Sequence, residues 1–185
     1  EVVYDGAPSD HFFNVVIESY TEEISAMIEA KDFQTRLCRL LPLKYSPHFT
    51  MQDDIHKRYR TFMGSDLQKF EFDVYLDGVP LYKPYLAEHI LESDIVFWEL
   101  SFDKENNALP QEKIGLLWFT FNRKVSSNPP QSPRGIFVRS KNMLLGNEYA
   151  IADAITKGNS EYVATYRELT QTLNGVYGEL LIDTA

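Results

Sequence analysis

The four histidines are the residues best suited to metal or acid–base chemistry, and their spacing argues against both. They are scattered along the chain, at His11, His48, His56 and His89. None has a second ligand at the short spacing that metal sites use. The nearest approach is "DDIH", but Asp53 and Asp54 fit the first turn of an exposed helix better than a metal cluster. We therefore predict no metal site.

Nucleophilic catalysis also lacks its usual patterns. Cys38, the single cysteine, lies in the apolar stretch "TRLCRLL" with no local partner to activate its thiol, and one cysteine cannot form an internal disulfide. A reducing compartment fits this usage. No serine stands in a nucleophile elbow, and the nine glycines form neither GxGxxG nor a GKS or GKT phosphate loop. We predict no catalytic residue and no cofactor in this segment.

A group of basic residues remains as a candidate contact site. Arg123 and Lys124 end one predicted strand, and "RGIFVRSKNMLLGN" (134–147) follows as the next. If the two strands are neighbours, five cations gather in one region of an acidic protein. Their aliphatic stems could cover the sheet while the charged heads stay in water, or the heads could meet an anion or another domain. The candidate interdomain or anion contacts are Arg123, Lys124, Arg134, Arg139, Lys141 and Asn142.

Helices are predicted at both ends of the chain. Residues 9–31 carry apolar side chains at helical spacing after a potential N-cap, Ser9. Further helices are expected at 34–41, 53–62, 148–156 and 160–173. At 185 residues and 44% hydrophobic composition, the chain can form one sizeable domain or two small ones.

Strands are predicted between these helical segments. "KFEFDVYLDGVPLY" alternates apolar and polar residues around Asp77-Gly78, which indicates a hairpin with a type I′ turn. Strands follow at 94–103 and 114–122, and "VYGELLID" closes the chain as another. Residues 134–147 read as a strand followed by a turn, in which Arg139 and Lys141 share one strand face. Because the strand at 114–122 is apolar on both faces, we expect it to be central. The order predicts an α+β or α/β layered domain with a four- or five-stranded mixed sheet.

The pattern of motifs resembles the middle domain of bacterial HSP-ninety-like ATPases of the GHKL superfamily. "GLLWFTF", then "RGIFVRSKNMLLGN", then helices and "NGVYGELLID" are similar to that family in order and spacing, as is "LPLKYSPHF" with "FEFDVYLDGVPLYKPY". The family often has an Arg-Phe-Asn triplet before the last strand, where this chain has Leu173-Asn174. The matching residues are Gly135, Ile136, Val138, Arg139, Asn142, Gly146, Gly178 and Glu179.

The resemblance implies a transducer-type fold like domain two of ribosomal protein S-five, with a mixed sheet, helices on one side and a left-handed βαβ crossover. Residues 1–41 would be a helical connector from an N-terminal ATPase domain, and 42–185 the middle domain with its last part truncated. ATP and Mg would be bound by the parent protein, and the family's phosphate-contacting cation would lie beyond Ala185. This segment would be noncatalytic.

The resemblance further implies a cytoplasmic molecular chaperone of the stress response. Its middle domain would transmit the ATP state to a client or partner protein, with the ATPase domain as a partner and a homodimer in the parent. The alternative from the residues is a self-contained interaction or single-stranded nucleic-acid-binding module that uses the basic residues. The formal charge of −9 argues against nucleic acid, and the lack of a long apolar run argues against a membrane span.

Overall fold

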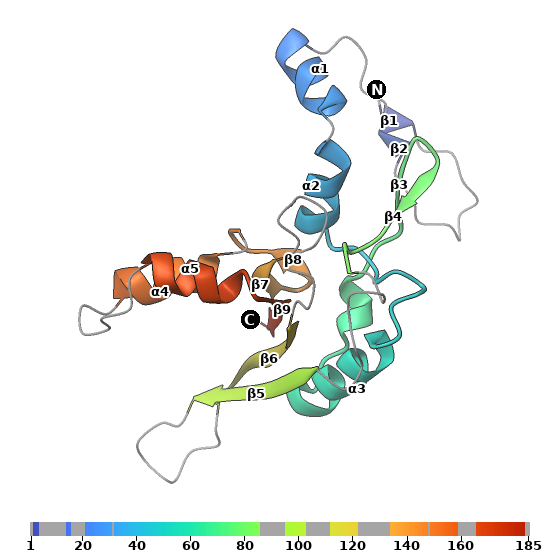
Figure 1. Ribbon diagram of the computed structural model, residues 1–185. Coiled ribbons are helices and arrows are strands. Elements are labelled where there is room, and N and C mark those ends of the chain that lie inside the picture. The colour runs from blue at the N-terminus through green and yellow to red at the C-terminus, as the bar shows by residue number, and fades with distance from the viewer. Residues whose placement is uncertain are drawn as a thin grey trace. The chain divides into compact units, whose positions relative to one another are not determined.

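The computed structural model places most of the chain, in two compact units that comprise residues 1–36 and 37–185. The structure describes residues 2–3, 14–15, 21–30, 32–85, 95–102, 112–121, 134–147, 149–158 and 166–183 (Figure 1).

The first unit contains a short strand pair and a helix. Strand β1 (Val2–Val3) pairs antiparallel with β2 (Asn14–Val15), and α1 (Glu22–Glu29) begins at Thr21, whose Oγ1 accepts a hydrogen bond from the Ile24 amide at 3.4 Å. The prediction of one helix over 9–31 is therefore wrong at residues 14–15, where Val15 begins the β-branched sequence Val-Val-Ile, which favours extended backbone. It is confirmed over α1, and Ser9 lies outside the described residues.

The other helices follow the predicted order. They are α2 (Phe33–Leu40), α3 (Gln52–Met63), the short 3-10 helix η1 (Leu67–Phe70), α4 (Ala150–Gly158) and α5 (Tyr166–Leu173). Asp53 and Asp54 occupy the first turn of α3, as expected. This helix ends at Gly64, a left-handed cap residue with φ of 76° whose amide donates to Arg60 O.

The predicted hairpin is confirmed. Strands β3 (Val74–Leu76) and β4 (Val79–Leu81) pair antiparallel, and Asp77 and Gly78 join them with φ angles of 51° and 77°. Two positive φ values in a two-residue loop define the type I′ turn, which Asp-Gly accommodates with little strain.

A five-stranded mixed sheet forms the centre of the second unit, so the predicted α+β class is confirmed. Its order is β5-β6-β9-β7-β8, with β9 antiparallel to β6 and parallel to β7. Strand β6 has neighbours on both sides, as predicted from its apolar faces, although β9 occupies the middle position. The strands are β5 (Val96–Phe102), β6 (Glu112–Phe121), β7 (Gly135–Ser140), β8 (Met143–Leu144) and β9 (Val176–Ile182).

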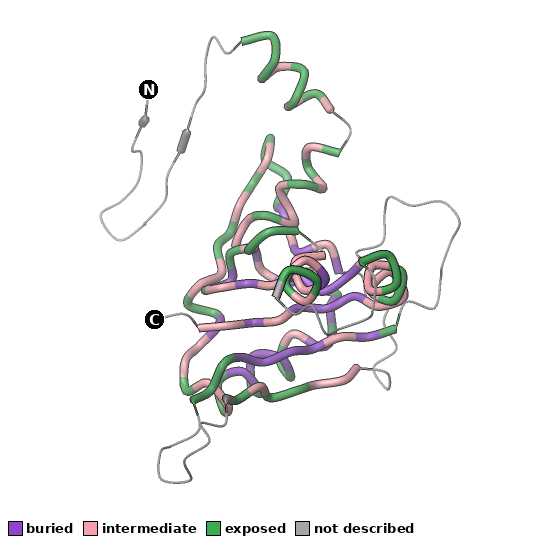
Figure 2. The backbone as a smooth tube through the Cα atoms, turned by 90° about the vertical axis from the view of Figure 1, so that its left-hand side faces the viewer, coloured by how far each residue is buried: buried purple, intermediate pink, exposed green. Residues whose placement is uncertain are grey.

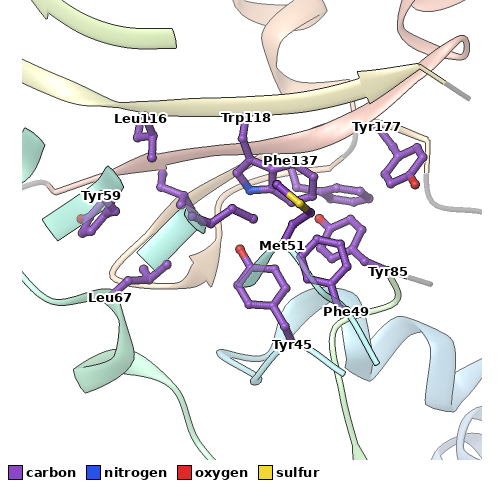
Figure 3. Close-up of a cluster of buried hydrophobic side chains, with 12 residues drawn as sticks. Tyr45, Phe49, Met51, Tyr59, Leu67, Tyr85, Leu116, Trp118, Phe137 and Tyr177 are labelled. Atoms are coloured by element: carbon purple, nitrogen blue, oxygen red, sulfur yellow. The ribbon is translucent and has the colours of Figure 1, made fainter. Parts of the chain in front are cut away.

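One face of this sheet carries the main core. Strand register aligns Trp118, Glu179 and Phe137 in one row across β6, β9 and β7. Partners opposite each other in a ladder point to the same face, so these three side chains project together. Ile55 and Tyr59 of α3 join them in a cluster that also contains Tyr45, Phe49 and Tyr85 from the loops (Figure 3).

Helices lie against both faces of the sheet, which corrects the expectation of helices on one side. The loops that carry Tyr45 and Tyr85 already cover the core face over β7 and β9. Helices α4 and α5 contact β7 and α5 also contacts β9, so they pack against the opposite face, to which strand alternation directs Ile136. Buried residues recur along the strands of the sheet (Figure 2). Among the described helices, none is both long enough and apolar enough to span a membrane.

Candidate functional site

Arg139, the most conspicuous cation of the sequence, lies inside the core. It follows Phe137 by two positions in β7, so strand alternation directs its side chain to the same, covered face. Its exposed fraction is 1%. The interpretation that its charged head stays in water is therefore wrong, because the loops from residues 41–45 and 81–85 cover this part of the sheet.

The anion that Arg139 meets belongs to the same chain. Its Nε forms an ion pair with Glu179 Oε1 at 2.6 Å. The other carboxylate oxygen, Oε2, accepts hydrogen bonds from the hydroxyl of Tyr45 at 2.5 Å, the indole of Trp118 at 3.2 Å and the ammonium of Lys83 at 3.3 Å. We call these five residues the Glu179 network.

Lys83 enters the network through an alternation that begins in β4. Leu81, Lys83 and Tyr85 are all buried, and the backbone amide of Lys83 donates to Lys44 O at 2.9 Å. This bond holds the segment extended, so alternate side chains face the core. The ammonium also lies 3.9 Å from the ring centre of Tyr45, a favourable cation–π contact.

Charge pairing keeps the buried carboxylate ionised. Burial alone would raise the pKa of Glu179, but the charges of Lys83 and Arg139 and the hydrogen bonds from Tyr45 and Trp118 lower it to about 2. Burial lowers the pKa of Lys83 to about 8, against the opposing effect of Glu179. One carboxylate thus stabilises two cations. Burial disfavours both positive charges, but it lowers the pKa of Lys83, whereas Glu179 and the nearby tyrosines leave the pKa of Arg139 raised.

Arg139 also connects the network to the end of α2. Its Nη2 donates to Arg39 O at 3.0 Å, and its Nη1 donates to Leu41 O at 3.2 Å and to Asn142 O at 2.8 Å. The last carbonyls of a helix have no partners within the helix, and a cation there also interacts favourably with the helix dipole. One guanidinium therefore joins the C-terminal end of α2 to the carboxylate in β9.

Asn142 and Lys141 form the turn between β7 and β8 instead of continuing a strand. Their φ angles are 66° and 47°, and β7 pairs antiparallel with β8 across them. The buried Asn142 side chain donates to Leu43 O at 3.3 Å and to Phe70 O at 3.2 Å, whereas Lys141 is exposed. The expectation that Lys141 shares a strand face with Arg139 is therefore wrong.

The premise of the predicted cluster of five cations is wrong. It was that β6 and β7 are neighbours, but β9 lies between them. Arg134 lies just before β7 and is partly buried, and Arg123 and Lys124 fall outside the described residues. The contact roles predicted for Arg134 and Lys141 remain predictions.

Sequence reasoning missed Lys83, Tyr45 and Trp118 as network members and knew Glu179 only as part of a motif. A usable signal was present, because period-two alternation in "LYKPY" places Lys83 with Leu81 and Tyr85 on one face. A lysine whose ammonium group is buried on an apolar face needs a compensating charge, such as a carboxylate. Which carboxylate this would be depends on strand order, which the alternation does not reveal.

The Glu179 network is suited to holding segments together. Glu179, Arg139 and Trp118 have exposed fractions of 0–1%, so no substrate reaches them in this conformation. Among the described residues, no cluster of three or more histidine, cysteine or acidic side chains could hold a metal ion. Comparison of the chain with family models, with curated proteins and with solved structures finds no match.

Proposed function

We propose that this chain is the noncatalytic middle domain of a heat-shock-chaperone-like GHKL ATPase, where it transmits the ATP state of another domain to a client or partner protein. The observation that carries the proposal is the Arg139–Glu179 pair. It joins the two sequence motifs on which the resemblance rests. The Arg139 guanidinium of this pair also donates hydrogen bonds to the backbone carbonyls at the end of α2.

Helix α2 is well placed to carry such a signal. The boundary between the two compact units falls within it, after Arg36. Its C-terminal end is bound to the sheet by Arg139, and the segment after it is bound by Asn142 through Leu43 O. A displacement of α2 would therefore strain hydrogen bonds of buried polar groups, which are costly to leave unpaired.

The parent protein of this proposal has the partners implied by the resemblance. An N-terminal ATPase domain binds ATP and Mg, the parent forms a homodimer, and the protein acts in the cytoplasm as a chaperone of the stress response. Residues 1–41 connect the two domains, and the phosphate-contacting cation lies beyond Ala185.

Two measurements test this function. The reading frame upstream of Glu1 should encode an Asn/Glu helix and a DxGxG motif, and their absence would defeat the family assignment. The purified 185-residue chain should neither bind nor hydrolyse ATP. Turnover that copurifies with the chain and disappears in a point variant of it would show that the chain is itself catalytic.

The structure argues against one of the two residues that the single-stranded nucleic-acid-binding alternative uses. It requires Arg134 and Arg139 to contact phosphates, and the buried guanidinium of Arg139 is engaged with Glu179 and three backbone carbonyls. Salt-sensitive oligonucleotide binding that is lost in Arg134→Ala would revive this alternative.

A further inference from the structure

A second site lies between the start of α3 and the segment before β3. It is a pocket of about 580 Å³, and its charged and polar lining includes Lys44, Asp53, His56, Gln68, Glu71 and Asp73. This volume is in the range of pockets that hold small ligands or single side chains. The Glu179 network does not include these six residues.

Glu71 is the innermost acidic group of this pocket. Its side chain is only 6% exposed, and its Oε1 lies 3.1 Å from Nε2 of His56, which is equally buried. Within the described part of the chain, the hydrogen bonds and ion pairs of Glu71 involve Oε1 alone. Its second oxygen is therefore available to a group that enters the pocket.

His56 fixes the orientation of this carboxylate. The amide nitrogen of Gln68 lies 3.1 Å from Nδ1 of His56. An amide NH₂ group can only donate, so Nδ1 accepts and the ring carries its hydrogen on Nε2, which then donates to Glu71. Gln68 and His56 thus hold Glu71 as a positioned acceptor.

The rim of the pocket is also acidic. Asp53 is exposed in the first turn of α3, and Asp73 is 58% exposed beside Lys44, with which it forms an ion pair at 2.8 Å. Asp53, Glu71 and Asp73 outnumber the one lysine of the lining. The electrostatic potential of the pocket therefore favours a cation and disfavours phosphate or a carboxylate.

We propose that this pocket binds a basic side chain of a partner protein, with its guanidinium or ammonium group on Glu71 and its alkyl stem along Tyr45, Tyr82 and Pro47. A charge-assisted hydrogen bond to the buried carboxylate supplies the directional contact, and Asp53 adds attraction at the entrance. This site is independent of the proposed coupling function and can stand if that function fails.

The test is a titration of the ¹⁵N-labelled chain, followed by NMR. N-acetyl-arginine methylamide represents the basic side chain, and N-acetyl-norleucine methylamide is the uncharged probe. We expect the arginine probe to shift the amide resonances of His56, Gln68 and Glu71, and its affinity to fall with added salt. The norleucine probe should leave them unchanged.

Two kinds of variant locate the contact. Glu71→Gln keeps the acceptor for His56 but removes the charge, and should weaken binding of the arginine probe by about tenfold. Asp53→Asn should weaken it by about threefold. Asp54→Asn is the matched control, because Asp54 lies in the same helical turn but does not line the pocket. If Glu71→Gln fails to fold, the comparison of the Asp53 and Asp54 variants still tests whether the arginine probe binds at this pocket.

Four results would overturn the proposal. The first two are no binding of the arginine probe at millimolar concentration and equal binding of the norleucine probe. The other two are equal losses of affinity for the arginine probe in Asp53→Asn and Asp54→Asn, and an unchanged affinity in a folded Glu71→Gln variant.

Discussion

Arg139 and Glu179 form an ion pair at 2.6 Å between two adjacent parallel strands, although two helices separate them along the chain. Glu179 stands opposite Phe137 in the ladder, so Arg139 reaches it from two positions further along β7. The pair is fully enclosed, and a buried charge without its partner is costly. The stability of the second unit should therefore depend on it.

Removal of the carboxylate should destabilise the protein strongly. Glu179→Gln leaves Arg139 and Lys83 buried without a compensating charge, and should lower the free energy of unfolding by about 3–5 kcal/mol. Urea titration followed by fluorescence of the buried Trp118 measures this change. Glu99→Gln, at an exposed position of β5, is the control and should change stability by less than about 0.5 kcal/mol. Similar losses in both variants would contradict a special role for Glu179.

The two cations of the network should differ in importance. Lys83→Met leaves the Arg139–Glu179 pair intact and removes a second buried positive charge. It should therefore lower the free energy of unfolding by no more than about 1.5 kcal/mol. Arg139→Met removes the hydrogen-bond donor of three backbone carbonyls and leaves Lys83 as the cation paired with Glu179. It should lower the free energy of unfolding by about 3–5 kcal/mol. Chemical denaturation of the two variants side by side is the measurement. Equal costs would mean that the carbonyl contacts contribute little.

Stability should fall in acid through Glu179. The lowered pKa of this group means that the folded state keeps it ionised down to about pH 2, whereas the unfolded chain takes up a proton near pH 4.5. Below pH 4.5 the unfolded state therefore binds more protons, and the free energy of unfolding decreases toward pH 2 by about 3 kcal/mol. Urea titrations at several pH values should show this slope in the wild type and a smaller one in Glu179→Gln. Identical slopes would show that other groups cause the acid sensitivity.

Two glycines should differ sharply in tolerance to alanine. A Cβ atom at Gly178 would lie 2.1 Å from Trp118 O and 2.6 Å from Phe119 Cα, both in the backbone of β6. Gly178→Ala must therefore separate β9 from β6 locally, and should lower the free energy of unfolding by about 2 kcal/mol or more. At Gly175 the nearest atom, Thr172 O, is 3.4 Å away, so Gly175→Ala should change stability by less than about 1 kcal/mol. Thermal unfolding of both variants tests the contrast.

The local elements of this protein were predictable because short-range patterns determine them. Asp77-Gly78 specifies its turn through backbone conformations that few residue pairs adopt without strain, and the structure has that turn. The apolar faces of "GLLWFTF" predicted a strand with neighbours on both sides, and β6 has them. Residues 14–15 were misassigned because apolar residues on both sides of them, such as Phe13 and Ile17, recur at helical spacing.

The sequence by itself determined the α+β class and most of the order of strands and helices, since periodicity and turn residues act over a few positions. Only the tertiary structure decided that β9 lies between β6 and β7. That insertion removes the premise of the predicted cation cluster, that β6 and β7 are neighbours, and places Glu179 beside Arg139. The physical reason is that an ion pair between distant segments depends on strand order and register, and no local pattern around Arg139 encodes which carboxylate it will meet.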